Sequence, residues 1–206
     1  MDIENGVQVS SVILCPAHRP TTTTKSPTTT TLKPTTTLLP TTTPTKPPPF
    51  CPGQIVLNNL VGVFLSKIIL EKIKKTPATI DFVKLGFGTG FAPPKRIIIF
   101  GTQIAQPNAF NIHTGEPGKL LVNANVLFHF SPRLNGNKVI RNTWIVGRGW
   151  EKEEVYGGFP FKAGEPFVLE LIAAPKNTII INVNKKFFAS FSRYDLSKVS
   201  QMVIEN

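Results

Sequence analysis

The sequence predicts an all-β protein: an antiparallel sandwich of two sheets, preceded by a disordered stalk rich in Thr and Pro. Beyond Pro77, short runs rich in Ile, Val, Phe and Thr alternate with polar residues, and Gly, Pro and Asn separate the runs. Between Pro20 and Pro49, Thr runs closed by Pro leave few apolar residues to bury. Strands this short and frequent are typical of a two-sheet sandwich, so we expect negligible helix beyond Pro77.

Eight runs are expected to form strands, each bounded by turn-forming residues. Together they make up a single domain over residues 79–206. The runs are Thr79–Leu85, Lys95–Gln103, Ala109–His113, Lys119–Phe130, Val139–Val146, Pro166–Ala173, Thr178–Val183 and Lys186–Ser192.

The stalk is assigned to residues 20–53, after an N-terminal segment over residues 1–19. Pro fixes φ and removes an N–H group, and β-branched Thr resists helix, so the backbone should be extended and polyproline-like. The composition is typical of an O-glycosylated stalk, with a bare flexible spacer as the alternative. Cys15 and Cys51 bracket this region and would pair with each other, pair with another chain, or stay unpaired thiols.

Residues 54–78 are an amphipathic insert of unclear role. Within residues 61–75 the apolar side chains recur at helical spacing with lysines on the opposite side, and Pro77 follows. This pattern predicts a short helix that lies on a membrane surface or, as we favour, packs on the neighbouring domain or carries no selected structure. Its apolar residues are Val61, Phe64, Leu65, Ile68, Ile69 and Ile73.

Composition excludes several classes of protein. The formal net charge of +11 divides into +5 over residues 1–78 and +6 over residues 79–206, so no basic arm forms and no nucleic-acid partner is expected. Asn58, Asn59 and Lys67 interrupt the most apolar stretch, so no integral membrane span is expected. With two Cys and no nucleophile, phosphate-loop or metal-ligand motif, the sequence predicts no enzyme, no cofactor and no metal site.

Polar side chains within residues 125–161 occupy positions that strand alternation places on one sheet face. His129, Ser131 and Arg133 are spaced i, i+2, i+4, so all three project from the same side of a strand. An indole, an imidazole, a guanidinium, an amide and a carboxylate suit a saccharide, whose C–H face stacks on indole while its hydroxyls need directed polar partners. The candidate binding residues are His129, Ser131, Arg133, Asn142, Trp150 and Glu153.

This segment resembles the carbohydrate-recognition signature of galectins, H-x-N-P-R, then V-x-N, then W-x-x-E-x-R. Flanking runs resemble galectin strands in order and spacing, namely Arg96–Thr102, Phe159–Leu171 and Ile181–Tyr194. The resemblance covers residues 79–206 and none of the stalk. It implies a jelly-roll-like, galectin/concanavalin-like sandwich that recognises β-galactosides through one shallow site.

The resemblance also implies a role for each residue. Trp150 would stack on the apolar face of galactose, and His129 with Arg133 would hold the axial 4-hydroxyl. Asn142 and Glu153 would bind the 6-hydroxyl, and Glu153 would orient Arg133. The expected partners are galactose-containing glycans or glycoproteins, and the sequence leaves the oligomeric state open, a weak oligomer included.

Three departures from the galectin pattern bear on binding. Ser131 stands where galectins usually have Asn, Val155 where they usually have Arg, and Glu151 where Gly usually follows the Trp. Loss of a charged hydrogen-bond donor costs about 1.5 to 3 kcal/mol, so the site could be weakened. The alternative function is therefore a galectin-like protein-interaction module with weakened or lost sugar binding.

Two further expectations concern the chain ends. Galectins usually continue with one more strand after the segment that matches Ser200–Asn206. Without that strand we expect one sheet edge to be unpaired. Residues 61–75 are one candidate to cover the edge, but an incomplete or mis-spliced sequence is the simpler explanation of the missing strand. The stalk favours extracellular residence. The acidic opening and the interrupted apolar stretch Val7–Leu14 make no convincing signal peptide, so non-classical secretion and a cytoplasmic location stay open.

Overall fold

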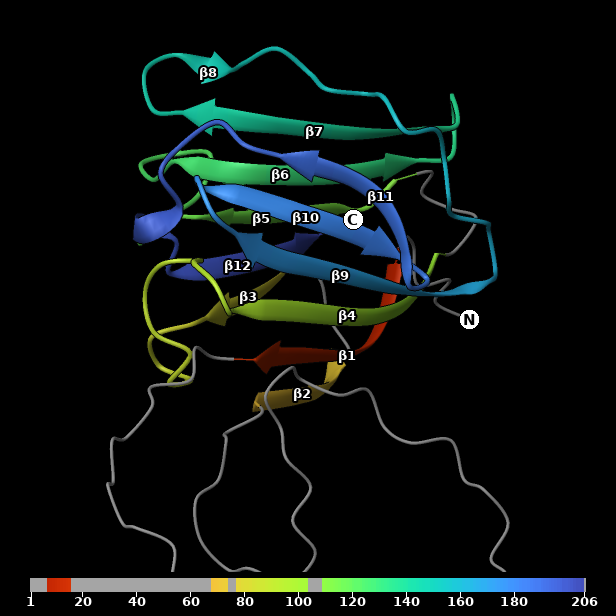
Figure 1. Ribbon diagram of the computed structural model, residues 1–206, viewed down its shortest axis with the longest axis horizontal. Helices are drawn as coiled ribbons and strands as arrows, with labels where there is room; N and C mark the ends of the chain where they lie inside the picture. The colour runs from red at the N-terminus through yellow and green to blue at the C-terminus, as the bar shows by residue number, and fades with distance from the viewer. Residues whose placement is uncertain (1–6, 16–67, 74–76, 104–108, 206) are drawn as a thin grey trace, which may run out of the picture.

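A computed structural model describes residues 7–15, 68–73, 77–103 and 109–205 of the 206-residue chain. The described residues form a sandwich of two six-stranded antiparallel sheets, which confirms the predicted fold class (Figure 1). Their only helix is a single 3-10 turn at Leu196–Lys198. None of the described segments is a helix of the length and apolarity that crossing a bilayer requires.

Each sheet draws strands from distant parts of the chain. Sheet A has the order β11-β10-β9-β4-β1-β2, and sheet B has the order β3-β12-β5-β6-β7-β8. Sheet A consists of β1 (Val7–Cys15), β2 (Ile68–Ile73), β4 (Arg96–Gln103), β9 (Pro166–Ala174), β10 (Thr178–Val183) and β11 (Lys186–Phe191). Sheet B consists of β3 (Ala78–Asp81), β5 (Asn111–Gly115), β6 (Val126–Arg133), β7 (Lys138–Ile145), β8 (Gly149–Trp150) and β12 (Gln201–Glu205).

The hydrophobic core lies between the sheets and is rich in phenylalanine. Phe110 stacks on Phe167 with ring centroids 5.4 Å apart, and Phe161 meets Phe167 edge-on at 5.1 Å. Phe128 and Phe130 of β6 are fully buried in the same cluster. Burial of each such side chain contributes about 1.5 to 3 kcal/mol, so the alternating apolar positions of the strands hold the two sheets together.

All eight expected strands exist, with shifts at their ends that have local causes. The first was expected over Thr79–Leu85 but ends at Asp81. Its carboxylate oxygen Oδ1 accepts the backbone N–H groups of Val83 at 3.0 Å and Lys84 at 3.1 Å. Asp side chains that bond nearby backbone in this way compete with the strand ladder and turn the chain.

The strand expected over Lys119–Phe130 begins only at Val126. The segment before it is a turn, in which Asn123 Oδ1 accepts the Lys119 N–H at 2.8 Å and Leu121 adopts a φ of 64°. Asn side chains favour such turns for the same reason as Asp. The turn places Leu121 beside the candidate site described below.

The helix expected over residues 61–75 is wrong where the structure describes it. Ile68–Ile73 is strand β2, which pairs antiparallel with β1 from Val9↔Ile73 to Leu14↔Ile68. Residues 61–67 and 74–76 lie outside the described residues. β-branched Ile favours strand over helix, and pairing with β1 supplies hydrogen-bond partners to the backbone of this segment.

The sheet edge expected to be unpaired is covered by β1. Strand β12 ends within sheet B between β3 and β5, whereas β1 pairs with β4 along its full length, from Val7↔Gln103 to Cys15↔Arg96. Residues 68–73, which belong to the 61–75 segment considered as a cover, form β2 on the other side of β1 as a strand and not as a helix. The sandwich therefore takes strands from both sides of the Thr/Pro-rich region, which lies outside the described residues together with the rest of residues 16–67.

The structure decides whether Cys15 is a free thiol or part of a disulfide. Cys15 is 3% exposed and disulfide-bonded, so an unpaired thiol is wrong at this position. Cys51 lies outside the described residues.

Gly115 is predicted to be required where β5 passes the Asn125 backbone. A Cβ atom at Gly115 would lie 2.1 Å from the Asn125 carbonyl oxygen, which itself accepts the Glu116 N–H at 3.1 Å. Gly115→Ala should therefore lower the free energy of unfolding by about 3 kcal/mol, measured by urea denaturation. Gly147→Ala is the control, because a Cβ atom at Gly147 would meet no other atom within 4 Å. Only the φ of 77° disfavours a side chain there, so the expected loss of unfolding free energy is about 1 kcal/mol. Equal losses in the two variants would contradict the proposed clash.

Candidate functional site

A depression in sheet B brings most of the candidate binding residues together. It has a volume of about 330 Å³, and five of the six candidates line it: His129, Arg133, Asn142, Trp150 and Glu153. Asn111 and His113 of β5 and Glu205 of β12 also line it. The depression is thus built by β12, β5, β6, β7 and β8 and by the loop that follows β8.

Three aromatic side chains meet in the depression. His113 and His129 are directly opposite each other on β5 and β6, and their rings stack with centroids 4.7 Å apart. Trp150 lies 4.7 Å from His129 and 6.2 Å from His113, measured between ring centroids. Trp150 is 48% exposed while both imidazoles are buried, so the indole offers an open apolar surface beside hidden polar groups.

The hydrogen bonds of the two histidines set the proton positions on their rings. His113 Nε2 lies 2.9 Å from Glu205 Oε1, and the Nδ1 atoms of His113 and His129 lie 3.3 Å apart. A carboxylate only accepts, so His113 donates from Nε2 and, as a neutral ring, accepts at Nδ1. His129 therefore donates from Nδ1, which leaves its Nε2 as an acceptor that no described residue bonds.

The electrostatics of the site agree with neutral rings. Burial first, and then electrostatic repulsion of the protonated ring by His113 and Arg133, lower the pKa of His129 to about 3. Burial also lowers the pKa of His113, against the opposing effect of the Glu205 carboxylate. Both imidazoles are therefore uncharged near pH 7, as the donor and acceptor assignment requires.

Asn142 is 2% exposed, and the protein uses most of its hydrogen-bonding capacity. Its amide nitrogen donates to the Glu151 carbonyl at 2.9 Å. Its Oδ1 accepts the Thr143 N–H at 2.8 Å and Arg193 Nη1 at 3.0 Å. An amide has two N–H donors and two acceptor lone pairs, so Asn142 offers a ligand one N–H.

The remaining candidates are placed differently from one another. Arg133 and Glu153 are exposed and line the depression, but no hydrogen bond or ion pair joins these two described residues. Ser131 is fully buried, does not line the depression, and its hydroxyl has no hydrogen-bond partner. Its cross-strand neighbour Ile140 does line the depression, so Ser131 lies at the margin of its floor.

Comparison with protein families shows to which family the chain belongs. The model of the galactoside-binding lectin family matches residues 83–205, more than half of the chain. The chain belongs to the galactoside-binding lectin family. The galectin resemblance drawn from the binding motifs is thereby confirmed.

Individual lectins of the family match at moderate identity. The 32 kDa β-galactoside-binding lectin of Haemonchus contortus is 34% identical over 121 residues, which cover 58% of this chain and 40% of that protein. Galectin-3 of Cricetulus longicaudatus is 31% identical over 124 residues, which cover 59% of this chain and 48% of that protein. The chain thus spans less than half the length of these curated relatives.

Solved structures show the same architecture. Galectin LEC-6 of Caenorhabditis elegans superimposes with a TM-score of 0.54 at 25% identity, over 64% of this chain and 84% of that one. A human galectin-16 variant superimposes with a TM-score of 0.53 at 22% identity, over 63% and 87%. The second match supports the fold alone.

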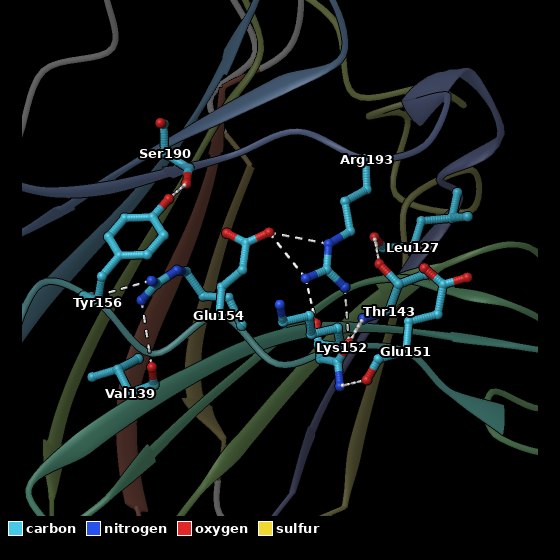
Figure 2. Close-up of polar contacts among 11 residues, drawn as sticks. Leu127, Val139, Thr143, Glu151, Lys152, Glu154, Tyr156, Ser190 and Arg193 are labelled. Atoms are coloured by element: carbon cyan, nitrogen blue, oxygen red, sulfur yellow. Dashed lines mark hydrogen bonds and ion pairs between the residues drawn. The ribbon is translucent and has the colours of Figure 1, made fainter.

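In this lectin the guanidinium that contacts the loop after Trp150 comes from Arg193, outside the binding motifs. Val155, which stands where galectins usually have Arg, is 46% exposed. Arg193, two residues after β11, instead lies between Glu154 and Asn142, as Figure 2 shows for its contact with Glu154. Its Nε donates to Glu154 Oε1 at 3.0 Å, and its Nη2 donates to the Lys152 carbonyl.

Further hydrogen bonds hold the loop after Trp150 in place. The Tyr194 hydroxyl donates to Glu151 Oε1, and Arg148 Nη2 lies 3.3 Å from the same oxygen. The Tyr156 hydroxyl donates to the Ser190 carbonyl at 2.8 Å (Figure 2). The loop is therefore held at several points, and Glu151 is one of its anchors.

Sequence analysis missed three residues that shape the site: His113, Glu205 and Arg193. His113 was placed on a strand, but nothing in the sequence aligned it with His129. Glu205 belongs to β12, which the alternation of Met202 and Ile204 could have revealed, since both are fully buried. Arg193 follows a strand as an ordinary exposed cation would, so no sequence signal marks it.

Acid should destabilise the lectin through His129. Its folded pKa of about 3 lies below the ordinary value of 6.5, so the unfolded chain takes up a proton first as the pH falls. Stability is then complete above pH 6.5 and declines by up to about 1.4 kcal/mol per pH unit below it, with His113 adding to the loss. Urea denaturation between pH 7 and pH 4.5 measures the slope.

His129→Gln is the comparison for this slope, because an amide does not titrate in that range. Asp81 and Asp195 also have lowered pKa values, but they change the stability only below their ordinary pKa of 3.8. They therefore do not contribute to the slope between pH 7 and pH 4.5. A His129→Gln variant with the same slope as the unmodified protein would show that His129 is not the source.

Arg193→Ala should loosen the loop after Trp150. The change leaves the Glu154 carboxylate without its ion pair and Asn142 with one acceptor bond fewer, at a cost of about 1 to 3 kcal/mol in unfolding free energy. Lys162→Ala is the matched control, since its exposed ion pair with Glu165 is worth under about 1 kcal/mol. Thermal unfolding compares the two, and an equal shift would contradict a special role for Arg193.

Proposed function

We propose that this lectin binds β-galactosides in the depression of sheet B. The observation that carries the proposal is the half-exposed indole of Trp150 beside buried His129, whose Nε2 is an acceptor that none of the described residues bonds. A pyranose has one apolar C–H face and hydroxyls with fixed directions, which this pairing of surfaces matches. Lectin relatives whose names state β-galactoside binding add to the support.

His129 and Arg133 together suit a single hydroxyl group. A hydroxyl donates one hydrogen bond and accepts others, so it can donate to His129 Nε2 and accept from the Arg133 guanidinium. The axial 4-hydroxyl of galactose is the group that this pair would hold. An equatorial 4-hydroxyl, as in glucose, would leave a buried acceptor unpaired at a cost of about 1 to 3 kcal/mol.

Asn142 and Glu153 offer a second hydroxyl group one hydrogen-bond donor and one acceptor. The remaining N–H of Asn142 donates and the Glu153 carboxylate accepts, which suits the 6-hydroxyl. Ser131 contributes no group to the depression, so the site has fewer polar contacts than the galectin pattern implies. Affinity for one sugar should be near the millimolar level, equivalent to about 4 kcal/mol.

Extracellular binding is part of this proposal. The buried disulfide at Cys15 supports it because such bonds persist in oxidising compartments.

Lactose affinity tests the proposed function. The unmodified protein should be retained on immobilised lactose and elute with free lactose but not with maltose. Trp150→Ala should weaken binding at least about tenfold, because the loss of stacking removes about 1.4 kcal/mol or more. Isothermal titration calorimetry with lactose gives the affinities of both proteins.

Phe187→Ala is the matched control for this experiment. Phe187 is 69% exposed and lies on β11 in sheet A, away from the depression, so its removal should leave lactose binding unchanged. Folded protein that passes through the lactose column unretained would overturn the proposal. Lactose binding by Trp150→Ala at the unmodified affinity would move the site elsewhere.

A further inference from the structure

The outer face of sheet A carries a second hydrophobic cluster, separate from the main core. The residues on either side of Ile13 and of Ile98 belong to the main core. Because successive side chains of a strand alternate between faces, this cluster lies on the side of sheet A that faces away from sheet B. The depression of sheet B is on the opposite side of the molecule. The members of this outer cluster are Ile13, Cys15 and Ile98, with Phe100 and Val168 packed against them.

The outer cluster is as inaccessible to solvent as the core. Ile13 is 4% exposed, Cys15 is 3% exposed and Ile98 is 1% exposed. All five members come from β1, β4 and β9 of sheet A, and sheet B, the other layer among the described residues, packs on the core side. The cover of the outer cluster is therefore to be sought in the part of the chain outside the described residues.

Residues 16–67 leave and rejoin the sandwich beside the outer cluster. Leu14 pairs with Ile68, so the chain departs at the end of β1 and returns at the start of the neighbouring strand β2. Figure 1 shows β1 between β4 and β2. Neighbouring strands lie about 4.8 Å apart, so both ends of residues 16–67 are fixed at the same part of sheet A.

The part of this region nearest β2 has the composition that the outer cluster requires. Unlike the Thr/Pro-rich part, residues 52–67 are rich in aliphatic side chains. A flexible chain of their length spans roughly 20 Å, and a cluster across three adjacent strands is about 10 Å wide, so the segment can reach and cover it. Its apolar residues are Ile55, Val56, Leu57, Leu60, Val61, Val63, Phe64 and Leu65.

Cys15 provides a covalent anchor within the outer cluster. It is disulfide-bonded, and the other cysteine of the sequence is Cys51, directly before residues 52–67. A thiol tethered by a short linker to the neighbouring strand has an effective concentration on the order of 1 mM, above that of a thiol on a separate molecule in ordinary solution. A bond within the chain is therefore favoured over a bond between chains.

We propose that the outer face of sheet A is a docking surface for residues 51–67 of the same chain, held by a disulfide between Cys15 and Cys51. The two thiols give up two electrons and two protons to an oxidised disulfide donor, which is reduced to a dithiol. The bond closes residues 16–50 into a loop. The Thr/Pro-rich region is then presented from the face opposite the depression of sheet B, with both of its ends fixed.

A protease nick in the Thr/Pro-rich region tests the bond in the full-length protein. A recognition site for a sequence-specific protease is inserted between Thr30 and Thr31. The protein is produced in an oxidising compartment, alkylated to block free thiols and cleaved. On a denaturing gel without reductant it should migrate as one species of monomer mass, because the disulfide joins the two pieces. With reductant the two pieces should separate.

Cys51→Ala is the matched control for the nick. Its cleaved form should separate into two pieces with or without reductant. The proposal is overturned if the cleaved protein with both cysteines also separates without reductant, since Cys15 would then not be bonded to Cys51. A species of twice the monomer mass without reductant would also overturn it, because the bond would then join two chains.

The unfolding temperature tests whether the two cysteines act as a pair. Cys51→Ala should lower Tm by about 10 °C, because the cross-link no longer restricts the unfolded chain. A double variant with Cys15→Ala and Cys51→Ala should lose no more than Cys15→Ala alone. An unchanged Tm in Cys51→Ala, or additive losses in the double variant, would contradict the pairing.

A separate variant tests the docking of the apolar segment. Ser replaces each apolar residue of the segment named above, and both cysteines are kept. Loss of the cover should lower Tm by about 5 °C and should speed the reduction of the disulfide by dithiothreitol. The control carries Thr28→Ser, Thr29→Ser and Thr30→Ser and should match the unmodified protein in both measurements. Equal Tm and equal reduction rates in the two variants would overturn the docking.

Discussion

The pleat of β6 links the hydrophobic core of this lectin to its candidate binding site. Phe128 and Phe130 point between the sheets and are fully buried, while His129 and Arg133 fall on the opposite face beside Trp150. Successive side chains of a strand alternate between faces, so one strand serves both purposes. A shift of β6 by one residue would exchange the two sets, which makes core packing and site geometry a single requirement.

The site is organised before any ligand arrives. Glu205, His113 and His129 form a chain of hydrogen bonds that fixes which ring nitrogen faces outward as an acceptor. Arg193 holds Asn142 and Glu154 together, and Tyr156 joins the same loop to β11. Binding groups with their partners already in place lose little freedom on binding, which matters for a shallow site with few contacts.

Strand β1 lies far from its neighbours in the sequence but is part of the core of the sandwich. It pairs with β4 on one side and with β2 on the other, and Val9, Val12 and Leu14 are buried in the main hydrophobic cluster. Strand order in space and strand order in sequence are thereby separated.

The sequence by itself determined the fold class, the eight strands beyond Pro77 and five of the residues that line the depression. Period-two alternation and turn residues are local signals, and the binding motifs lie within one hairpin and the turn after it. Only the tertiary structure decided that Ile68–Ile73 pairs as a strand, that Glu205 and His113 set the polarity of His129, and that Arg193 serves the loop after Trp150. These depend on contacts between residues 39 and 92 positions apart or on a choice of partner strand, which no local pattern encodes.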